Sequence, residues 1–446
     1  MDGFIKIKKG LDIKLLGEAQ NKVTEILTDD FALKPTDFIG VFPRLLVKEG
    51  DIVKAGSPVF CDKYRESVQF TSPVSGKISE IRRGDKRVLL EVGIQADKDI
   101  VFEDFGREDM ASLGRRQLID KMLLSGVWPA IRQRPYTVIA NPDDTPAAIF
   151  ISGFDSAPLS PDYAFILKDE LAGFQAGVDV LARLTSGKVY IGIPEFNHPL
   201  AGIRNAVITC FKGPHPAGNV GIQIHHIRPI NKGDIVWTVN PQDVVVIGRL
   251  FSSGRYDASV TVALAGSEVR EPQYYKVRKG ISVKPLISGN LKGDTQRIIS
   301  GNVLTGDRIS HNGYLGFYHN QFTVIPEGNY FEFMGWAMPG FGKFSFSKTF
   351  FSWAHKDKKY KLDTNFHGGE RSYVMTGQYE KVLPMDILPM QLIKACLLED
   401  VELMEKLGIY EVDEEDFALV EYIDTSKTEI QSIIRKGIDL IRKEMS

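Results

Sequence analysis

Three histidines in a segment rich in Pro and Gly are the first residues that could do chemistry, because imidazole is a common zinc ligand. They are His215, His225 and His226, within residues 211–229. If the segment is extended, neighbouring residues point to opposite faces, and His225 and His226 would not readily share a metal ion. No carboxylate motif accompanies them. We therefore favour a structural loop with hydrogen-bonded histidines, and we predict no metal ligand.

Lys63 could carry a cofactor arm. It lies within residues 47–84, where Gly-Asp and Ser-Gly turn dipeptides are flanked by alternating apolar residues. This stretch resembles the flattened sandwich of biotinyl and lipoyl carrier domains, which display one lysine at a hairpin tip. Tyr64 and Arg65 follow Lys63, however, and the second strand is longer than in lipoyl domains. We predict an ordinary hairpin lysine and a carrier-like docking module without a carried group.

A dense aromatic tract could bind a ring-shaped ligand. From Phe317 to Trp353 there are 13 aromatic residues in 37 positions, against 10% in the whole chain. An apolar groove for a quinone-like ring or for a partner protein is one interpretation, and a packed core or interdomain seam is the other. The candidate contact residues for a quinone or a partner are Phe331, Phe333, Trp336 and Phe341.

The signatures of most catalytic and cofactor sites are absent from the sequence. There is no G-x-G-x-x-G after a strand, no G-x-x-x-x-G-K-[ST], no H-E-x-x-H, no C-x-x-C and no G-x-S-x-G. We therefore predict no catalytic and no cofactor-binding residue on this chain.

The bulk composition is that of an ordinary multidomain globular protein. The 446 residues are 43% apolar and 25% charged, which suggests two to four domains. A net charge of −2 gives no sign of nucleic-acid binding. Three scattered cysteines favour a reducing compartment. The sequence shows neither a signal peptide nor about 20 consecutive apolar residues, so we expect a cytoplasmic protein that can still lie against a membrane complex.

The spacing of apolar residues predicts a multidomain α/β protein in four parts. Residues 1–100 form a β sandwich, residues 101–257 alternate strands and helices, residues 258–330 form a small β-rich fold with one helix, and residues 331–446 hold the aromatic tract and a helical end. In the second part, the expected helices are 113–124 and 162–184, and the expected strands are 136–140, 147–151, 188–193, 206–209 and 243–248. In the third part, we expect a strand at 260–264 and a short helix at 282–288.

Three blocks give the chain a family resemblance. Residues 5–12 read IKIKKGLD, residues 213–218 read GPHPAG and residues 379–389 read YEKVLPMDILP. With these blocks the whole chain resembles the A subunit of the sodium-translocating NADH:quinone reductase (Na+-NQR). That family is similar to the C subunit of Rnf complexes and to the NADH-binding flavoprotein subunit of respiratory complex I.

The resemblance implies a function and a set of partners. The complex of six subunits reduces ubiquinone with NADH and couples this to Na+ export, with FMN, FAD, riboflavin and a 2Fe-2S centre on other subunits. This chain would be a peripheral scaffold on the cytoplasmic side of the bacterial inner membrane, with a part in quinone access. Its domains would be a biotinyl/lipoyl-like sandwich, a Rossmann-like domain, a ubiquitin-like SLBB domain and a helical end.

Two departures from the family pattern limit what the resemblance carries over. Gln223 stands where relatives have the first histidine of a pair, and residues 420–425 lack the thiolates that some relatives carry. A role for the histidine pair is therefore in doubt, and an iron–sulfur cluster at 420–425 is excluded with those ligands. The alternative function is a free-standing carrier-domain protein or an NADH-binding dehydrogenase.

Overall fold

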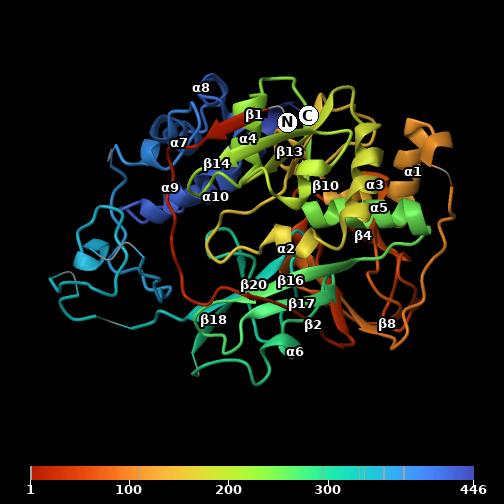
Figure 1. Cartoon of the computed structure of the whole chain (residues 1–446), viewed down its shortest axis with the longest axis horizontal. Coiled ribbons are helices and arrows are strands. Elements are labelled where there is room, and N and C mark those ends of the chain that lie inside the picture. Colours follow the sequence, from red (N-terminus) through yellow and green to blue (C-terminus); the bar gives the residue numbers. More distant parts are fainter. Residues whose placement is uncertain are drawn as a thin grey trace.

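The computed structural model describes residues 3–108, 110–293, 295–330, 332–335, 337–354, 357–374 and 377–445. Its largest sheet lies in the α/β part (Figure 1). The strands in spatial order are β1 (Gly3–Lys6), β14 (Val207–Lys212), β13 (Lys188–Ile193), β12 (Ala148–Ser152), β15 (Val236–Val239), β10 (Ile131–Arg134) and β11 (Val138–Ile139). The first five are parallel, and β10 is antiparallel to β15.

Five helices accompany this sheet. They are α1 (Arg115–Ser125), α2 (Tyr163–Leu167), α3 (Leu171–Ala182), α4 (Val220–Ile227) and α5 (Pro241–Ser253). The predictions of a helix at 113–124 and of strands at 147–151, 188–193 and 206–209 are confirmed. The expected strand at 136–140 shortens to the two residues of β11, and the expected helix at 162–184 divides into α2 and α3.

The predicted strand at 243–248 is wrong, because these residues lie inside α5. Asn240 caps the helix by accepting a hydrogen bond from the Gln242 N–H, and Pro241 fills its first position. Both faces of the helix are buried along this run, so its Val and Ile residues form a continuous apolar stretch without helical periodicity. Such a stretch cannot be distinguished from a buried strand by pattern alone.

A second sheet contains both parallel and antiparallel strands. It follows the α/β part in the chain, and a polar junction connects the two. Its strands in order are β19 (Asp307–Ile309), β18 (Gln296–Ser300), β20 (Gln321–Pro326), β16 (Ser259–Ala265), β17 (Gln273–Arg278) and β2 (Gln20–Glu25), and helix α6 (Lys284–Ile287) lies between β17 and β18 in the chain. The strand and the short helix predicted here are confirmed.

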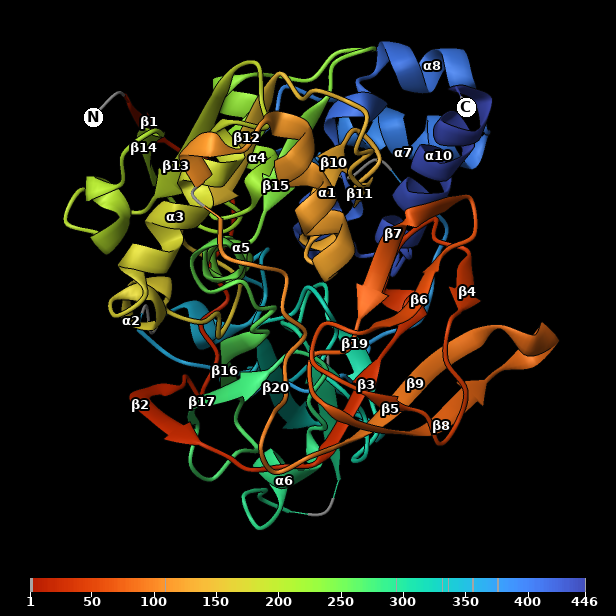
Figure 2. The same ribbon diagram turned by 90° about the vertical axis from the view of Figure 1, so that its right-hand side faces the viewer.

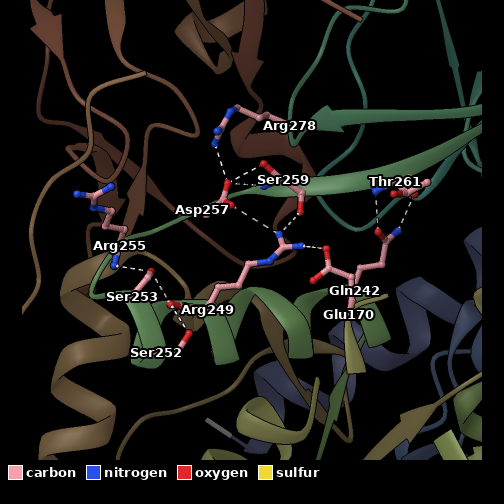
Figure 3. Close-up of polar contacts among 10 residues, drawn as sticks. All are labelled: Glu170, Gln242, Arg249, Ser252, Ser253, Arg255, Asp257, Ser259, Thr261 and Arg278. Atoms are coloured by element: carbon pink, nitrogen blue, oxygen red, sulfur yellow. Dashed lines mark hydrogen bonds and ion pairs between the residues drawn. The ribbon is translucent and has the colours of Figure 1, made fainter. Parts of the chain in front are cut away.

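The junction between α5 and β16 is fixed by side chains that bind the backbone (Figure 3). Arg249 donates to the Ser259 carbonyl at 2.8 Å and pairs with Glu170, while Asp257 accepts from Arg278 at 2.9 Å. These contacts hold the start of β16 against the end of α5.

Two smaller sheets form the sandwich (Figure 2). One contains β3 (Asp30–Leu33), β9 (Leu89–Ala96), β8 (Gly76–Arg83) and β5 (Ile52–Val53), and the other contains β4 (Pro43–Leu45), β6 (Pro58–Asp62) and β7 (Arg65–Thr71). The stacked rings of Phe60 and Phe70, 4.5 Å apart, lie in the core. The outer ends of β8 and β9 project as a two-stranded ribbon.

The chain ends in helices, as predicted. They are α7 (Pro389–Leu397), α8 (Val401–Lys406), α9 (Ala418–Ile423) and α10 (Ile430–Met445). Helix α10 packs closely on α7, because a Cβ at Gly437 would lie 2.5 Å from the Cys396 sulfur. No helix in the described part of the chain is long and apolar enough to cross a membrane.

The first 33 residues connect the parts. Strand β1 joins the large sheet, β2 joins the second sheet and β3 joins the sandwich (Figure 2). Between β1 and β2, Gly17 has φ +99° and a Cβ there would lie 2.2 Å from the Gly266 backbone. Only glycine permits this close approach, which brings the N-terminal segment against the second sheet.

Candidate functional site

The carboxyl ends of the parallel strands meet at one edge of the large sheet, where α/β folds bind their ligands. The chain proceeds from β12 to β13 and β14 on one side, and then crosses to β15 on the other side of β12. The crevice beyond β12 and β15 is therefore the position at which a ligand is expected.

The crevice is filled by side chains from two parts of the molecule. Tyr163, the first residue of α2, is buried there and accepts hydrogen bonds from the side-chain amides of Asn240 at 3.3 Å and Asn320 at 3.1 Å. The Asp162 N–H donates to the Tyr274 hydroxyl at 2.9 Å. Because Asn320 and Tyr274 come from the second-sheet region, that region closes the crevice over the end of the large sheet.

His215 lies in the loop after β14 and binds the loop after β12. The Ser156 hydroxyl accepts from the Gly218 N–H at 2.8 Å and shares a hydrogen bond with His215 Nδ1 at 3.0 Å. The His215 N–H donates to Asp12 at 2.9 Å. Burial lowers the pKa of His215 to about 4, so the ring is neutral near pH 7. As expected, the histidine is hydrogen-bonded within a structural loop.

Gln223 fills the space between α4 and the ends of β12 and β13. Its amide donates to the Ser152 hydroxyl at 2.7 Å and to the Ala217 carbonyl at 3.3 Å. A Cβ at Gly192 would lie 2.1 Å from the Gln223 amide oxygen, so the glycine makes room for it. The residue that departs from the family pattern therefore has a packing role beside the candidate crevice.

The N-terminus of α4 faces a carboxylate of the chain itself. Helix N-termini carry partial positive charge and bind phosphate in many nucleotide-binding folds. Here Asp416 occupies this position, since both its carboxylate oxygens would lie 2.5 Å from a Cβ at Gly221. Asp416 accepts from Arg134 at 3.0 Å and from the Asp413 N–H at 3.0 Å. The Asp416 carboxylate thus occupies the position at which the phosphate of a ligand would bind.

Asp416 belongs to a buried ionic cluster that joins β10 to the C-terminal helices. Arg134 is 1% exposed and contacts both Asp416 and Asp413, the latter at 3.4 Å. Arg435 of α10 pairs with Glu414 at 3.0 Å. Burial raises the pKa of Glu414 to about 9, with Asp413 adding to the shift. Burial also raises the pKa of Asp416, although Arg134 opposes this shift.

The other two histidines lie on α4, so the segment is helical and the argument for an extended segment does not apply to them. His225 Nε2 accepts from the Asp386 N–H at 3.2 Å, so its Nδ1–H donates to Glu411 at 2.7 Å. His226 Nδ1 donates to the Ile222 carbonyl at 2.9 Å. His225 therefore links α4 to the C-terminal region. Among the residues that the structure describes, no three His, Cys, Asp or Glu side chains are placed to hold a metal ion.

Lys63 lies at the tip of a hairpin. It occupies the turn between β6 and β7 with Tyr64, its side chain is exposed, and its ammonium lies 5.7 Å from the centre of the Tyr64 ring. Its N–H donates to the Phe42 carbonyl at 2.7 Å. The predicted hairpin position is confirmed, and the absence of a carried group stays a prediction.

The aromatic tract divides into a buried part and an exposed part. Phe317 and Phe322 are buried against the second sheet, whereas Phe333 is 80% exposed and Phe341 is 59% exposed. The core-packing interpretation is therefore wrong for Phe333 and Phe341. The other two candidate contacts, Phe331 and Trp336, lie outside the described residues.

Sequence reasoning missed the ionic cluster. Residues 413–416 are four consecutive acidic residues, which normally indicate a solvated segment. The one signal that could have revealed it was their position between residues 409–412, which are apolar except for Glu411, and the apolar run 417–420; the structure buries every residue of both segments.

Comparison with known proteins agrees with the three folded parts. The family described as "NqrA N-terminal barrel-sandwich hybrid domain" matches residues 5–97, "NqrA second alpha/beta domain" matches residues 113–256 and "NQRA C-terminal domain", of SLBB type, matches residues 261–311. The match to a solved NAD+-reducing [NiFe]-hydrogenase covers 77% of this chain and 67% of the hydrogenase chain. The two are 11% identical in sequence, and the TM-score is 0.38.

Full-length relatives are more similar. The A subunit of the Na(+)-translocating NADH-quinone reductase of Hahella chejuensis is 40% identical over 99% of this chain and 100% of its own length. The protein of the same name from Yersinia pestis bv. Antiqua is also 40% identical, with the same coverage. Identity at this level over the whole length establishes the family. The chain belongs to the family of the A subunits of Na(+)-translocating NADH-quinone reductases.

Proposed function

We propose that this chain is the peripheral A subunit of a Na+-translocating NADH:ubiquinone reductase. That complex reduces ubiquinone to ubiquinol with NADH and couples the reaction to Na+ export. The observation that carries the proposal is 40% identity to proteins of that name over the full length. The proposed location is the cytoplasmic side of a bacterial inner membrane, and the proposed partners are the other five subunits.

Within the complex, the proposed role is that of a scaffold without a cofactor of its own. FMN, FAD, riboflavin and 2Fe-2S would lie on other subunits, with NADH, ubiquinone and Na+ as substrates. The filled crevice supports this role, because Tyr163 and Gln223 occupy the space beyond the strands and Asp416 occupies the N-terminus of α4. A dinucleotide or flavin phosphate would have to displace these groups.

We also propose finer labels for the parts of the scaffold. The sandwich is biotinyl/lipoyl-like over 1–100, the α/β part is Rossmann-like over 101–257, the SLBB domain spans 258–330, and the aromatic tract with the helical C-terminal domain spans 331–446. The reversal of strand order between β12 and β15 supports the Rossmann-like label. Strands β1 and β2 would then be contributions of the first part to the sheets of its neighbours.

Deletion and add-back of the chain test the proposed function. Membranes lacking it should lose sodium-dependent quinone reduction, and purified chain added back should restore it. The purified chain should have the mass of its sequence and contain neither flavin nor iron. Stoichiometric flavin or iron, or an added lipoyl or biotinyl mass on Lys63, would contradict the scaffold role, as would full activity of membranes that lack the chain.

The proposed quinone contact has a separate test. If the tract at Phe331, Phe333, Trp336 and Phe341 helps quinone to enter, Trp336→Ala in the assembled complex should raise the apparent KM for ubiquinone severalfold and leave kcat unchanged. Tyr64→Ala, which removes an exposed aromatic side chain from the sandwich hairpin, is the matched control. An unchanged KM in the Trp336 variant would remove the quinone contact.

A further inference from the structure

A long loop between β20 and α7 forms one end of the molecule (Figure 1). Its outer part exposes large apolar side chains to an unusual degree, between 49% and 80% of their surface. They are Phe333, Met334, Met338, Phe341, Phe351 and Trp353. Contiguous exposed apolar groups of this kind mark a surface that meets a partner or a membrane.

The loop is held in shape by its own hydrogen bonds. The Phe351 N–H donates to the Pro339 carbonyl at 3.0 Å, and the Lys343 ammonium donates to the Gly335 carbonyl at 2.9 Å. The rings of Phe341 and Phe351 stack with their centres 6.3 Å apart. The exposed side chains are therefore presented by a defined backbone, although they do not cover a core.

The charges of the loop distinguish between classes of partner. From Phe333 to Ala354 the sequence contains no Asp, Glu or Arg, and its two charged residues are Lys343, which pairs with Glu332 just before this run, and Lys348. Lys348 is exposed. Protein interfaces favour Arg and are depleted in Lys, whereas segments at a bilayer surface combine Trp and Phe with Lys, which attracts anionic headgroups. The composition therefore favours a lipid surface over a protein.

We propose that this loop inserts into the headgroup region of an anionic bilayer and holds the protein on the membrane. The inference rests on the proposed function, because a subunit of a membrane complex works beside lipid. Under this proposal the partner of the aromatic tract is lipid. The same surface of the protein would also contact a quinone dissolved in the bilayer. The apolar side chains would enter the acyl boundary while Lys348 stays among the phosphates.

Vesicle flotation with the full-length purified chain tests the proposal. The chain should float with vesicles of phosphatidylethanolamine and phosphatidylglycerol, and less with phosphatidylcholine alone. Phe333→Ser with Phe341→Ser should lower the partition coefficient at least about tenfold, because two large apolar side chains no longer leave water. Lys348→Glu should weaken binding to the anionic vesicles and change binding to phosphatidylcholine little.

Leu27→Ser with Ile52→Ser is the matched control. These two apolar residues are 96% and 75% exposed elsewhere on the molecule, so their loss should leave flotation unchanged. A wild-type chain that does not float, or a Phe333/Phe341 variant that floats like wild type, would overturn the proposal. If that variant floats normally but dissociates from the other subunits, the loop binds a protein and the lipid assignment is wrong. Co-purification of the wild-type chain with the other subunits tests the proposed function separately.

Discussion

Arg134→Ala is expected to lower the free energy of unfolding by about 3 to 5 kcal/mol. The guanidinium is 1% exposed and neutralises Asp413 and Asp416, which are also buried. Removing it leaves Asp416 without its cation and leaves Asp413 with only the more distant Arg435 at 3.7 Å, in a site that water does not reach, and this costs far more than loss of an exposed ion pair. Urea unfolding followed by circular dichroism measures the loss. Hydrogen exchange in α4 should also accelerate, since Asp416 packs against its first turn.

Two variants separate the charge effect from the loss of the side chain. Arg116→Ala removes an exposed arginine with two acidic neighbours, Asp120 and Asp143, and should change stability by less than about 1 kcal/mol. Combining Arg134→Met with Asp413→Asn and Asp416→Asn removes the buried charges together and should recover part of the stability. A loss below about 1 kcal/mol for Arg134→Ala would show that the cluster does not hold β10 to the C-terminal helices.

The secondary structure of the large sheet could be predicted where an apolar run and the turn residues before it indicated the same element. The run 188–193 is an apolar stretch that follows a Ser-Gly turn, and it forms β13 at the predicted bounds. The run 243–248 has the same apolar character but follows an Asn-Pro helix start, and it forms α5. Composition within the run cannot separate the two cases, because most residues of both elements are buried. The residues just before each run distinguish the helix from the strand.

The filling of the candidate crevice could not be predicted, because it depends on contacts between distant parts of the chain. Arg134 and Asp416 are 282 residues apart in sequence, and the sequence around each residue does not indicate the other as its partner. Similarly, Phe322 and Phe333 are aromatic residues of one tract, yet the first is fully buried and the second is exposed. The two residues differ because Phe322 lies in β20, a strand of the second sheet, whereas Phe333 lies beyond the end of that strand.

The stability of this protein should fall as the pH decreases from about 6.5 to about 4, and His215 should account for about 3 kcal/mol of that loss. The imidazole is 3% exposed, and burial lowers its pKa to about 4 from the ordinary 6.5. Between these pH values the unfolded chain binds a proton that the folded chain does not, so acid favours unfolding. The contribution of His215 is complete above about pH 6.5, where both states are neutral.

Comparing His215→Asn with wild type isolates this contribution. The Asn side-chain amide can both donate and accept, so it can replace His215 Nδ1 in the hydrogen bond to the Ser156 hydroxyl, and it does not titrate in this range. Asp155 in the same loop also has a perturbed pKa, raised by burial, but it is present in both proteins and cancels in the difference. Urea unfolding from pH 4 to pH 7.5 should give wild type the steeper decline toward acid. Equal slopes would mean that the ring is protonated while buried, and the neutral link between the loops after β12 and β14 would then be wrong.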